Sequence, residues 1–139
     1  MYKFYFPWIV SVDEVNHRNH VSHQNYFVYF SQARDAYLEQ FGCNERDLFG
    51  YGLIITEVYC RYKRELSQGD CLRVYCRVAK MTDKMMRMHY EIQKDDILCA
   101  EGGTTCLCYD YGQKKVAALP LRLVEQVSAY EGEMRGVPL

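Results

Sequence analysis

The stretch QNYFVYFSQARDAYLEQFG, residues 24–42, decides the fold that the sequence predicts. Its apolar and small side chains recur every three or four positions, the spacing of one helical face, at Tyr26, Phe30, Ala33, Tyr37 and Phe41. Ser22 is a suitable N-cap, and Gly42 suits the left-handed residue that commonly ends a helix. We therefore predict one long helix that begins near residues 22–24 and stops at Gly42.

The segments around this helix have the pattern of strands. Apolar and polar residues alternate in LRVYCRV (72–78) and MRMHYEI (86–92), as in strands with one buried face. The other predicted elements are strands in YKFYFPWIVSV (2–12, with Pro7 at an edge or bend), LIITEVYCRY (53–62) and ILCAEGGTTCLCYDY (97–111), and a terminal helix from near Pro120. Turn-forming runs lie between the four later strands, which predicts hairpin succession. Gly102 and Gly103 predict a bulge or a close backbone approach.

One aromatic helix cannot cover both faces of such a sheet. We therefore predict an α+β domain over residues 1–139, with a curved antiparallel sheet wrapped around one long central helix. A second copy of the chain is expected to bury the remaining edge or face.

Composition excludes several classes of protein. The formal net charge of -1 argues against a nucleic-acid binder, which needs a basic excess. No apolar run approaches the ~18 residues of a membrane span, and the N-terminus lacks the pattern of a signal peptide. The seven cysteines include no C-x-x-C pair. Cys106 and Cys108 share one strand face, which favours packing over metal ligation. We expect a reduced, cytoplasmic protein.

The residues DEVNHRNHVSHQNYFVYF (13–30) concentrate the polar chemistry, with His17, His20 and His23 spaced by three. In a helix this spacing would spread the rings over about 240°, so they could ligate zinc together only in a loop. Histidine also suits proton transfer near neutral pH, although no G-x-S-x-G nucleophile motif accompanies it. A polar loop that caps the helix remains a third interpretation.

Two features near the helix favour a binding or catalytic site. Unpaired amides at the helix start, around His23, suit a carbonyl oxygen that becomes negative. Arg34 lies at the edge of the apolar stripe, where its charge needs a partner. We expect either an ion pair with Glu14, Asp35 or a partner carboxylate, or a contact with substrate.

The run EVNHRNHVSHQNY (14–26), the helix, EVYCRYKRELSQGDCLRV (57–74) and AALPLRL (117–123) together resemble the 4-hydroxybenzoyl-CoA thioesterase group of the hotdog superfamily. That group has a catalytic aspartate at the position that Asn16 occupies. Thioesterases of enediyne polyketide pathways have Glu-x-Asn there and a helical arginine that matches Arg34, as this chain does.

The resemblance implies a hotdog fold, homodimers or homotetramers with active sites at the subunit interface, and hydrolysis of an acyl thioester on coenzyme A or an acyl carrier protein. Asn16 and Arg34 would polarise the substrate or position water, and Glu14 or His23 would be the general base. Tyr26 and His20 would line the substrate site. No cofactor and no metal are expected.

Two other functions remain open. Without the aspartate, the chain could be a non-catalytic module that binds acyl-CoA or an acyl carrier. A hotdog dehydratase would need a glutamate on the central helix facing a histidine, and Glu39 lies too near the helix end for this role.

Overall fold

The computed structural model describes residues 1–132 and 134. The elements in chain order are β1 (Tyr5–Ile9), the 3-10 turn η1 (Val12–Glu14), α1 (His23–Glu39), β2 (Gly52–Tyr62), β3 (Cys71–Met81), β4 (Met85–Lys94), β5 (Ile97–Asp110), β6 (Lys115–Val116) and α2 (Leu121–Glu131). Within the described part of the chain, no helix is long and apolar enough to cross a membrane.

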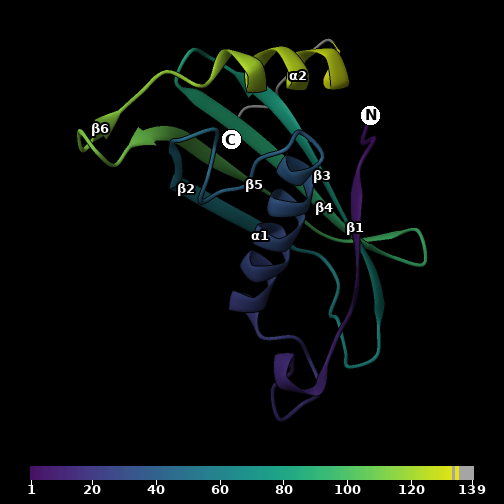
Figure 1. The fold of residues 1–139 in the computed structure, drawn as a ribbon. Helices are drawn as coiled ribbons and strands as arrows, with labels where there is room; N and C mark the ends of the chain where they lie inside the picture. Colours follow the sequence, from purple (N-terminus) through teal and green to yellow (C-terminus); the bar gives the residue numbers. More distant parts are fainter. Residues whose placement is uncertain (133, 135–139) are drawn as a thin grey trace.

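The strands form one antiparallel sheet in the order β1-β3-β4-β5-β2, and β6 extends it by pairing with β5. Helix α1 packs against one face of this sheet, and the N-terminal loop lies at the lower end of the helix in Figure 1. The predicted α+β class is confirmed. The prediction of one central helix is incomplete, because α2 also packs on the sheet, against β3.

The predicted hairpin succession is correct for β3, β4 and β5 but wrong for the first connection. Strand β2 pairs with β5, whereas β3 lies between β1 and β4. Residues 63–70 therefore cross from one side of the sheet to the other, anchored by the fully buried Leu66. Period-two patterning identifies the buried face of a strand but carries no information about its neighbour, so the sequence could not decide this connection.

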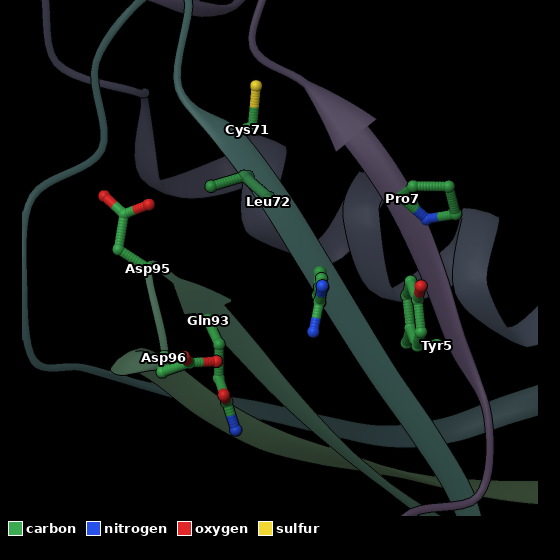
Figure 2. A pocket seen from close by; sticks show the side chains of 8 residues that line it. Tyr5, Pro7, Cys71, Leu72, Gln93, Asp95 and Asp96 are labelled. Atoms are coloured by element: carbon green, nitrogen blue, oxygen red, sulfur yellow. The ribbon is translucent and has the colours of Figure 1, made fainter.

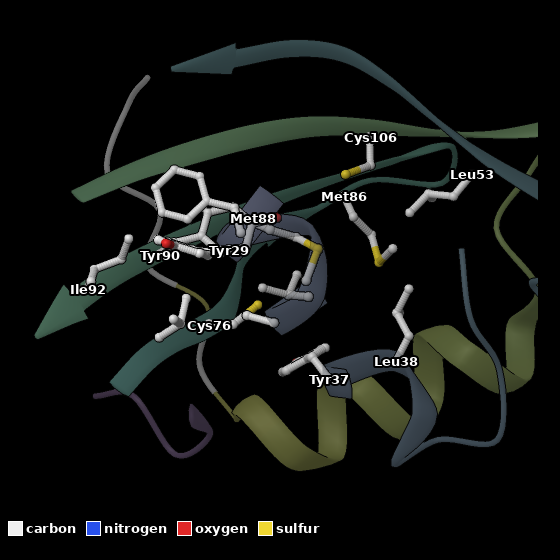
Figure 3. Close-up of a cluster of buried hydrophobic side chains, with 14 of the residues drawn as sticks. Tyr29, Tyr37, Leu38, Leu53, Cys76, Met86, Met88, Tyr90, Ile92 and Cys106 are labelled. Carbon is white, nitrogen blue, oxygen red and sulfur yellow. The ribbon is translucent and has the colours of Figure 1, made fainter. Parts of the chain in front are cut away.

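The predicted inner faces of β3 and β4 are confirmed. Eight side chains along them are at most 2% exposed: Leu72, Val74, Cys76, Val78, Met86, Met88, Tyr90 and Ile92. Figure 3 shows Tyr29, Tyr37 and Leu38 of α1 gathered against these strands. Burying such apolar surface is the main stabilising contribution to the fold.

Gly102 makes a close contact rather than a bulge. Phe30 of α1 stacks on Tyr90, with ring centroids 4.5 Å apart. A Cβ at Gly102 would lie 2.6 Å from the Phe30 ring and 2.3 Å from the Tyr59 carbonyl oxygen. Only glycine allows Phe30 to approach the sheet this closely.

The predicted start of α1 is confirmed, whereas the helix ends at Glu39, three residues before Gly42. Ser22 is the N-cap with extended backbone angles. Gly42 has φ 84° beyond the other end, and its N–H bonds to the Glu39 carbonyl while Cys43 bonds to that of Leu38. The terminal helix begins after Pro120, as predicted, and Pro7 lies in β1 at the edge of the sheet.

Candidate functional site

The candidate site is the loop of residues 10–22, which joins β1 to the start of α1. The loop closes on itself: the Asn16 N–H donates to the His20 carbonyl at 2.8 Å, and Val15 bridges to Val21. Asn19 turns the chain with φ 61°, a conformation that asparagine tolerates well. The histidine-rich stretch is therefore a loop up to His20 and becomes helical at His23.

Asn16 is exposed at the tip of this loop. Its Oδ1 accepts hydrogen bonds from the backbone N–H groups of Arg18, at 2.9 Å, and His20, at 3.2 Å. These two bonds use the carbonyl half of the amide to shape the turn. The chemistry that Asn16 can offer to a ligand is therefore donation from Nδ2.

Glu14 connects the loop to β1 and α1 through hydrogen bonds. Its Oε1 accepts from Trp8 Nε1 at 3.0 Å, from the Ser11 N–H at 3.2 Å and from the Tyr29 hydroxyl at 2.8 Å. Burial alone would raise the pKa of Glu14, but these hydrogen bonds outweigh burial and lower it. A carboxylate with a lowered pKa is a weaker base.

The first turn of α1 is open to solvent at His23 and Gln24. The His23 carbonyl accepts from the Tyr62 hydroxyl of β2 at 3.3 Å. Tyr62 packs edge-on against Tyr26, with centroids 4.7 Å apart. Tyr26 is buried beneath the turn, and burial raises the pKa of its hydroxyl to about 12, so this group stays protonated at neutral pH.

The crossover of residues 63–70 supports the other side of the loop. His20 Nε2 lies 3.0 Å from Glu65 Oε2, and the Val21 N–H donates to the Leu66 carbonyl at 2.7 Å. The Gln68 N–H donates to Asn19 Oδ1 at 3.3 Å. The structure thus brings five of the six predicted site residues to the loop and the first turn of α1: Glu14, Asn16, His20, His23 and Tyr26.

The sixth predicted residue, Arg34, lies elsewhere. It follows His23 by eleven positions, which is about 16 Å along a helix axis. The Arg34 side chain is 7% exposed, and its Nε and Nη2 lie 2.9 and 2.7 Å from Glu45 Oε1. Its carboxylate partner is thus Glu45, and the predicted partners Glu14 and Asp35 are wrong.

A second hydrogen bond holds Arg34 inside the protein. Its Nη1 donates to the Tyr90 hydroxyl at 3.0 Å, and that hydroxyl lies 2.8 Å from Thr104 Oγ1. Burial would lower the pKa of Arg34, but Tyr90 and Glu45 raise it further than burial lowers it. The guanidinium is therefore charged and enclosed in a polar network between α1 and the sheet.

The hollow beside β1 lies outside the loop. A hollow of about 390 Å³ separates Tyr5 and Pro7 of β1 from the β4–β5 turn, and Figure 2 shows Cys71 and Leu72 along it. The predicted site residues are not among those that line it.

Among the residues described, no three His, Cys, Asp or Glu side chains are grouped to hold a metal ion. Burial raises the pKa of Cys60, on β2, to about 11, which disfavours a thiolate nucleophile there.

Sequence reasoning missed Trp8, Tyr29, Tyr62 and Glu45. Trp8 and Tyr29 have the pattern of ordinary strand and core residues, and their contacts with Glu14 join positions 6 and 15 residues apart. Tyr62 reaches His23 across 39 residues. Of these four residues, only Glu45 had a signal in the sequence, because the charge of Arg34 requires a carboxylate nearby.

Comparison with known proteins identifies the family. A model of the thioesterase-like superfamily matches residues 10–127. The chain belongs to the thioesterase-like superfamily. Among curated proteins, this member is 29% identical over 108 residues to a protein of Aquifex aeolicus named "Putative esterase", a match that covers 76% of this chain and 82% of the relative.

Solved structures have the same hotdog-like fold. A hypothetical protein from Staphylococcus aureus, determined in complex with CoA, superposes with a TM-score of 0.86 at 22% identity, covering 100% of this chain and 91% of that protein. The 1,4-dihydroxy-2-naphthoyl-CoA thioesterase from Synechocystis superposes with a TM-score of 0.84 at 16% identity, covering 94% and 98%. At these identities the likeness establishes the fold alone.

Proposed function

We propose that this superfamily member is a thioesterase that hydrolyses an acyl-CoA or an acyl thioester of a carrier protein. The observation that carries the proposal is the open first turn of α1, which follows directly on the loop that carries the exposed amide of Asn16. Membership of the superfamily supports it, as do structural neighbours that are a CoA complex and a CoA thioesterase.

In the proposed reaction the thioester oxygen faces the backbone amides at the start of α1, near His23. These amides and the positive end of the helix dipole stabilise the negative charge that develops on this oxygen. Asn16 Nδ2 donates to the same oxygen or holds the attacking water. His23 is exposed and accepts a proton from water as the water oxygen bonds to the carbonyl carbon. The carbon–sulfur bond then breaks, and His23 returns the proton to the leaving thiolate.

Other predicted residues take supporting roles in this proposal. His20, which pairs with Glu65, and the buried Tyr26 form the wall of the site. Glu14 is a poor candidate for the general base, because its hydrogen bonds lower its pKa. Arg34, enclosed by Glu45 and Tyr90, is assigned to the structure of α1 rather than to substrate binding.

We further propose that residues 1–139 act as one domain and that two copies pair to complete the site. Strand β2 is an edge strand, and it exposes Ile55, Val58 and Tyr62. An open apolar edge of this kind is usually covered by another strand. Tyr62 lies on this edge, and its hydroxyl donates to the His23 carbonyl in the first turn of α1. Pairing through β2 would therefore place a second subunit beside the candidate site.

The test is hydrolysis of short, medium, long and aryl acyl-CoA substrates and of acyl carrier proteins by wild type and Asn16→Ala. Free CoA, or the free carrier protein, is measured by chromatography, because the exposed Cys71 thiol would react with thiol dyes. We expect wild-type turnover and a fall of about 100-fold in kcat for Asn16→Ala.

Asn44→Ala is the matched control. Asn44 Oδ1 accepts from two backbone N–H groups, of Arg46 and Asp47, both at 2.9 Å, as Asn16 does at the other end of α1. Turnover should be unchanged in this variant. Substrate binding without release of free CoA or of free carrier protein, for every acyl group, would instead identify a non-catalytic binding module.

A further inference from the structure

We propose that Glu14 is a positioning residue, held by Trp8 and Tyr29, that fixes the loop so that Asn16 and the first turn of α1 meet the substrate together. This inference rests on the proposed function of the same site. It assigns roles to Trp8 and Tyr29, which the sequence pattern alone places in the core.

Three elements converge on one oxygen atom of Glu14. Trp8 donates from β1, Ser11 from the start of η1 and Tyr29 from the second turn of α1, all to Oε1 at 2.8–3.2 Å. The rings of Trp8 and Tyr29 also contact each other, with centroids 6.0 Å apart. We call the contacts of Trp8, Ser11 and Tyr29 with Glu14 the Glu14 junction. Hydrogen bonds to a charged acceptor are about twice as strong as neutral ones, so this junction resists opening.

The backbone of Glu14 holds the far end of the loop as well. Its carbonyl oxygen accepts from the Ser22 N–H at 3.1 Å and from Asn25 Nδ2 at 2.9 Å. Side chain and backbone of one residue thus fix both where the loop leaves β1 and where α1 begins. Asn16 lies two residues beyond Glu14, so its position relative to the helix amides depends on this junction.

The same contacts make Glu14 a poor proton acceptor. The three hydrogen bonds to Oε1 stabilise the charged carboxylate and lower the pKa of Glu14, so either oxygen takes a proton from water less readily. In a positioning role the residue needs only an acceptor of the right shape, whereas a general base needs an ionisable carboxylate. Glutamine supplies the first property and lacks the second.

The experiment compares wild type with Glu14→Gln, Glu14→Ala and Tyr29→Phe in steady-state hydrolysis of the best acyl-CoA substrate. We expect Glu14→Gln to keep kcat within about threefold, and Glu14→Ala and Tyr29→Phe to lose about tenfold or more in kcat with KM changed less than twofold. The double variant Glu14→Ala/Tyr29→Phe should be no slower than Glu14→Ala, since both changes break the same junction.

Tyr37→Phe is the matched control. Tyr37 lies on α1 two turns beyond Tyr29, and its hydroxyl also donates to a carboxylate, that of Glu131. Both tyrosines are fully buried, and Figure 3 shows both in the core. Tyr37→Phe should lower the melting temperature about as much as Tyr29→Phe while leaving kcat unchanged.

Three results would overturn the inference. Glu14→Gln as inactive as Glu14→Ala, with the acid limb of the pH profile lost, would make Glu14 the base. Equal kcat in Tyr29→Phe and Tyr37→Phe would make the junction a purely structural feature. A double variant much slower than either single variant would show that Glu14 and Tyr29 act independently.

Amide hydrogen exchange separates this inference from the proposed function. Exchange in residues 15–22 should quicken in Glu14→Ala and Tyr29→Phe but not in Tyr37→Phe. If wild type hydrolyses no thioester, the proposed function fails and the catalytic role of the junction fails with it. Unchanged exchange in an active enzyme would reject the positioning role alone.

Discussion

The two ends of α1 use similar polar groups in opposite ways. At the N-terminal end, Asn16 and His23 are exposed, and a carboxylate at Glu14 ties the loop to the helix. Toward the C-terminal end, Arg34 is enclosed by Glu45 and Tyr90. Both ends also have an asparagine whose side chain shapes a turn. The difference in exposure, rather than in residue type, marks the N-terminal end as the candidate site.

The largest expected effect tests whether the Arg34 end is structural. Glu45→Ala leaves a buried guanidinium without its carboxylate, which should lower the free energy of unfolding by about 3 kcal/mol. Urea unfolding followed by circular dichroism measures the change. Glu65→Ala, which removes the exposed partner of His20, is the control and should cost less than about 0.5 kcal/mol. Equal small losses in both variants would contradict the contrast between the two ends.

Gly102→Ala tests how closely α1 packs on the sheet between its two ends. The added Cβ would clash with the Tyr59 carbonyl oxygen and the Phe30 ring, so we expect a loss of about 2 kcal/mol in the free energy of unfolding. Gly112→Ala, in a turn where the nearest atom would lie 3.3 Å away, is the control. A Gly102→Ala protein as stable as wild type would mean that Phe30 moves aside freely.

Asn16→Asp tests what the exposed end supplies to the substrate. Aspartate can accept the same two backbone hydrogen bonds, so stability should change by less than about 0.5 kcal/mol. The carboxylate has no N–H to donate, and we expect kcat for acyl-CoA to fall about tenfold. A faster Asn16→Asp enzyme would instead show that this position acts as a base.

The smallest expected effect is the pH dependence of the Glu14 junction. The pKa of Glu14 is lowered in the folded protein, so its carboxylate stabilises the fold above the usual glutamate pKa of about 4.3. This stabilisation is lost as the pH falls through the lower pKa of the folded state. Thermal unfolding should therefore show wild type more stable than Glu14→Gln at pH 7, with the difference shrinking below about pH 4. A difference independent of pH would contradict the role of the charge.

Local pattern predicted much of the fold. Helical spacing located α1, alternation located the inner faces of β3 and β4, and Gly42 and Pro120 marked helix boundaries. Residues close together in the sequence determine these features through backbone geometry, so the features can be predicted from one sequence. Strand order could not be predicted in this way, because the pairing of β2 with β5 joins residues up to 57 positions apart, and alternation does not encode which strands pair.

The candidate site also has a part that the sequence predicted and a part that only the tertiary structure determined. By itself the sequence determined where the polar residues gather, at positions 14–26, and that a helix begins there. Only the tertiary structure decided that Glu14 is engaged by Trp8 and Tyr29 and that Arg34 belongs with Glu45 and Tyr90. The physical reason is that hydrogen-bond partners are chosen by distance in space, and these partners come together only when the sheet and α1 have packed.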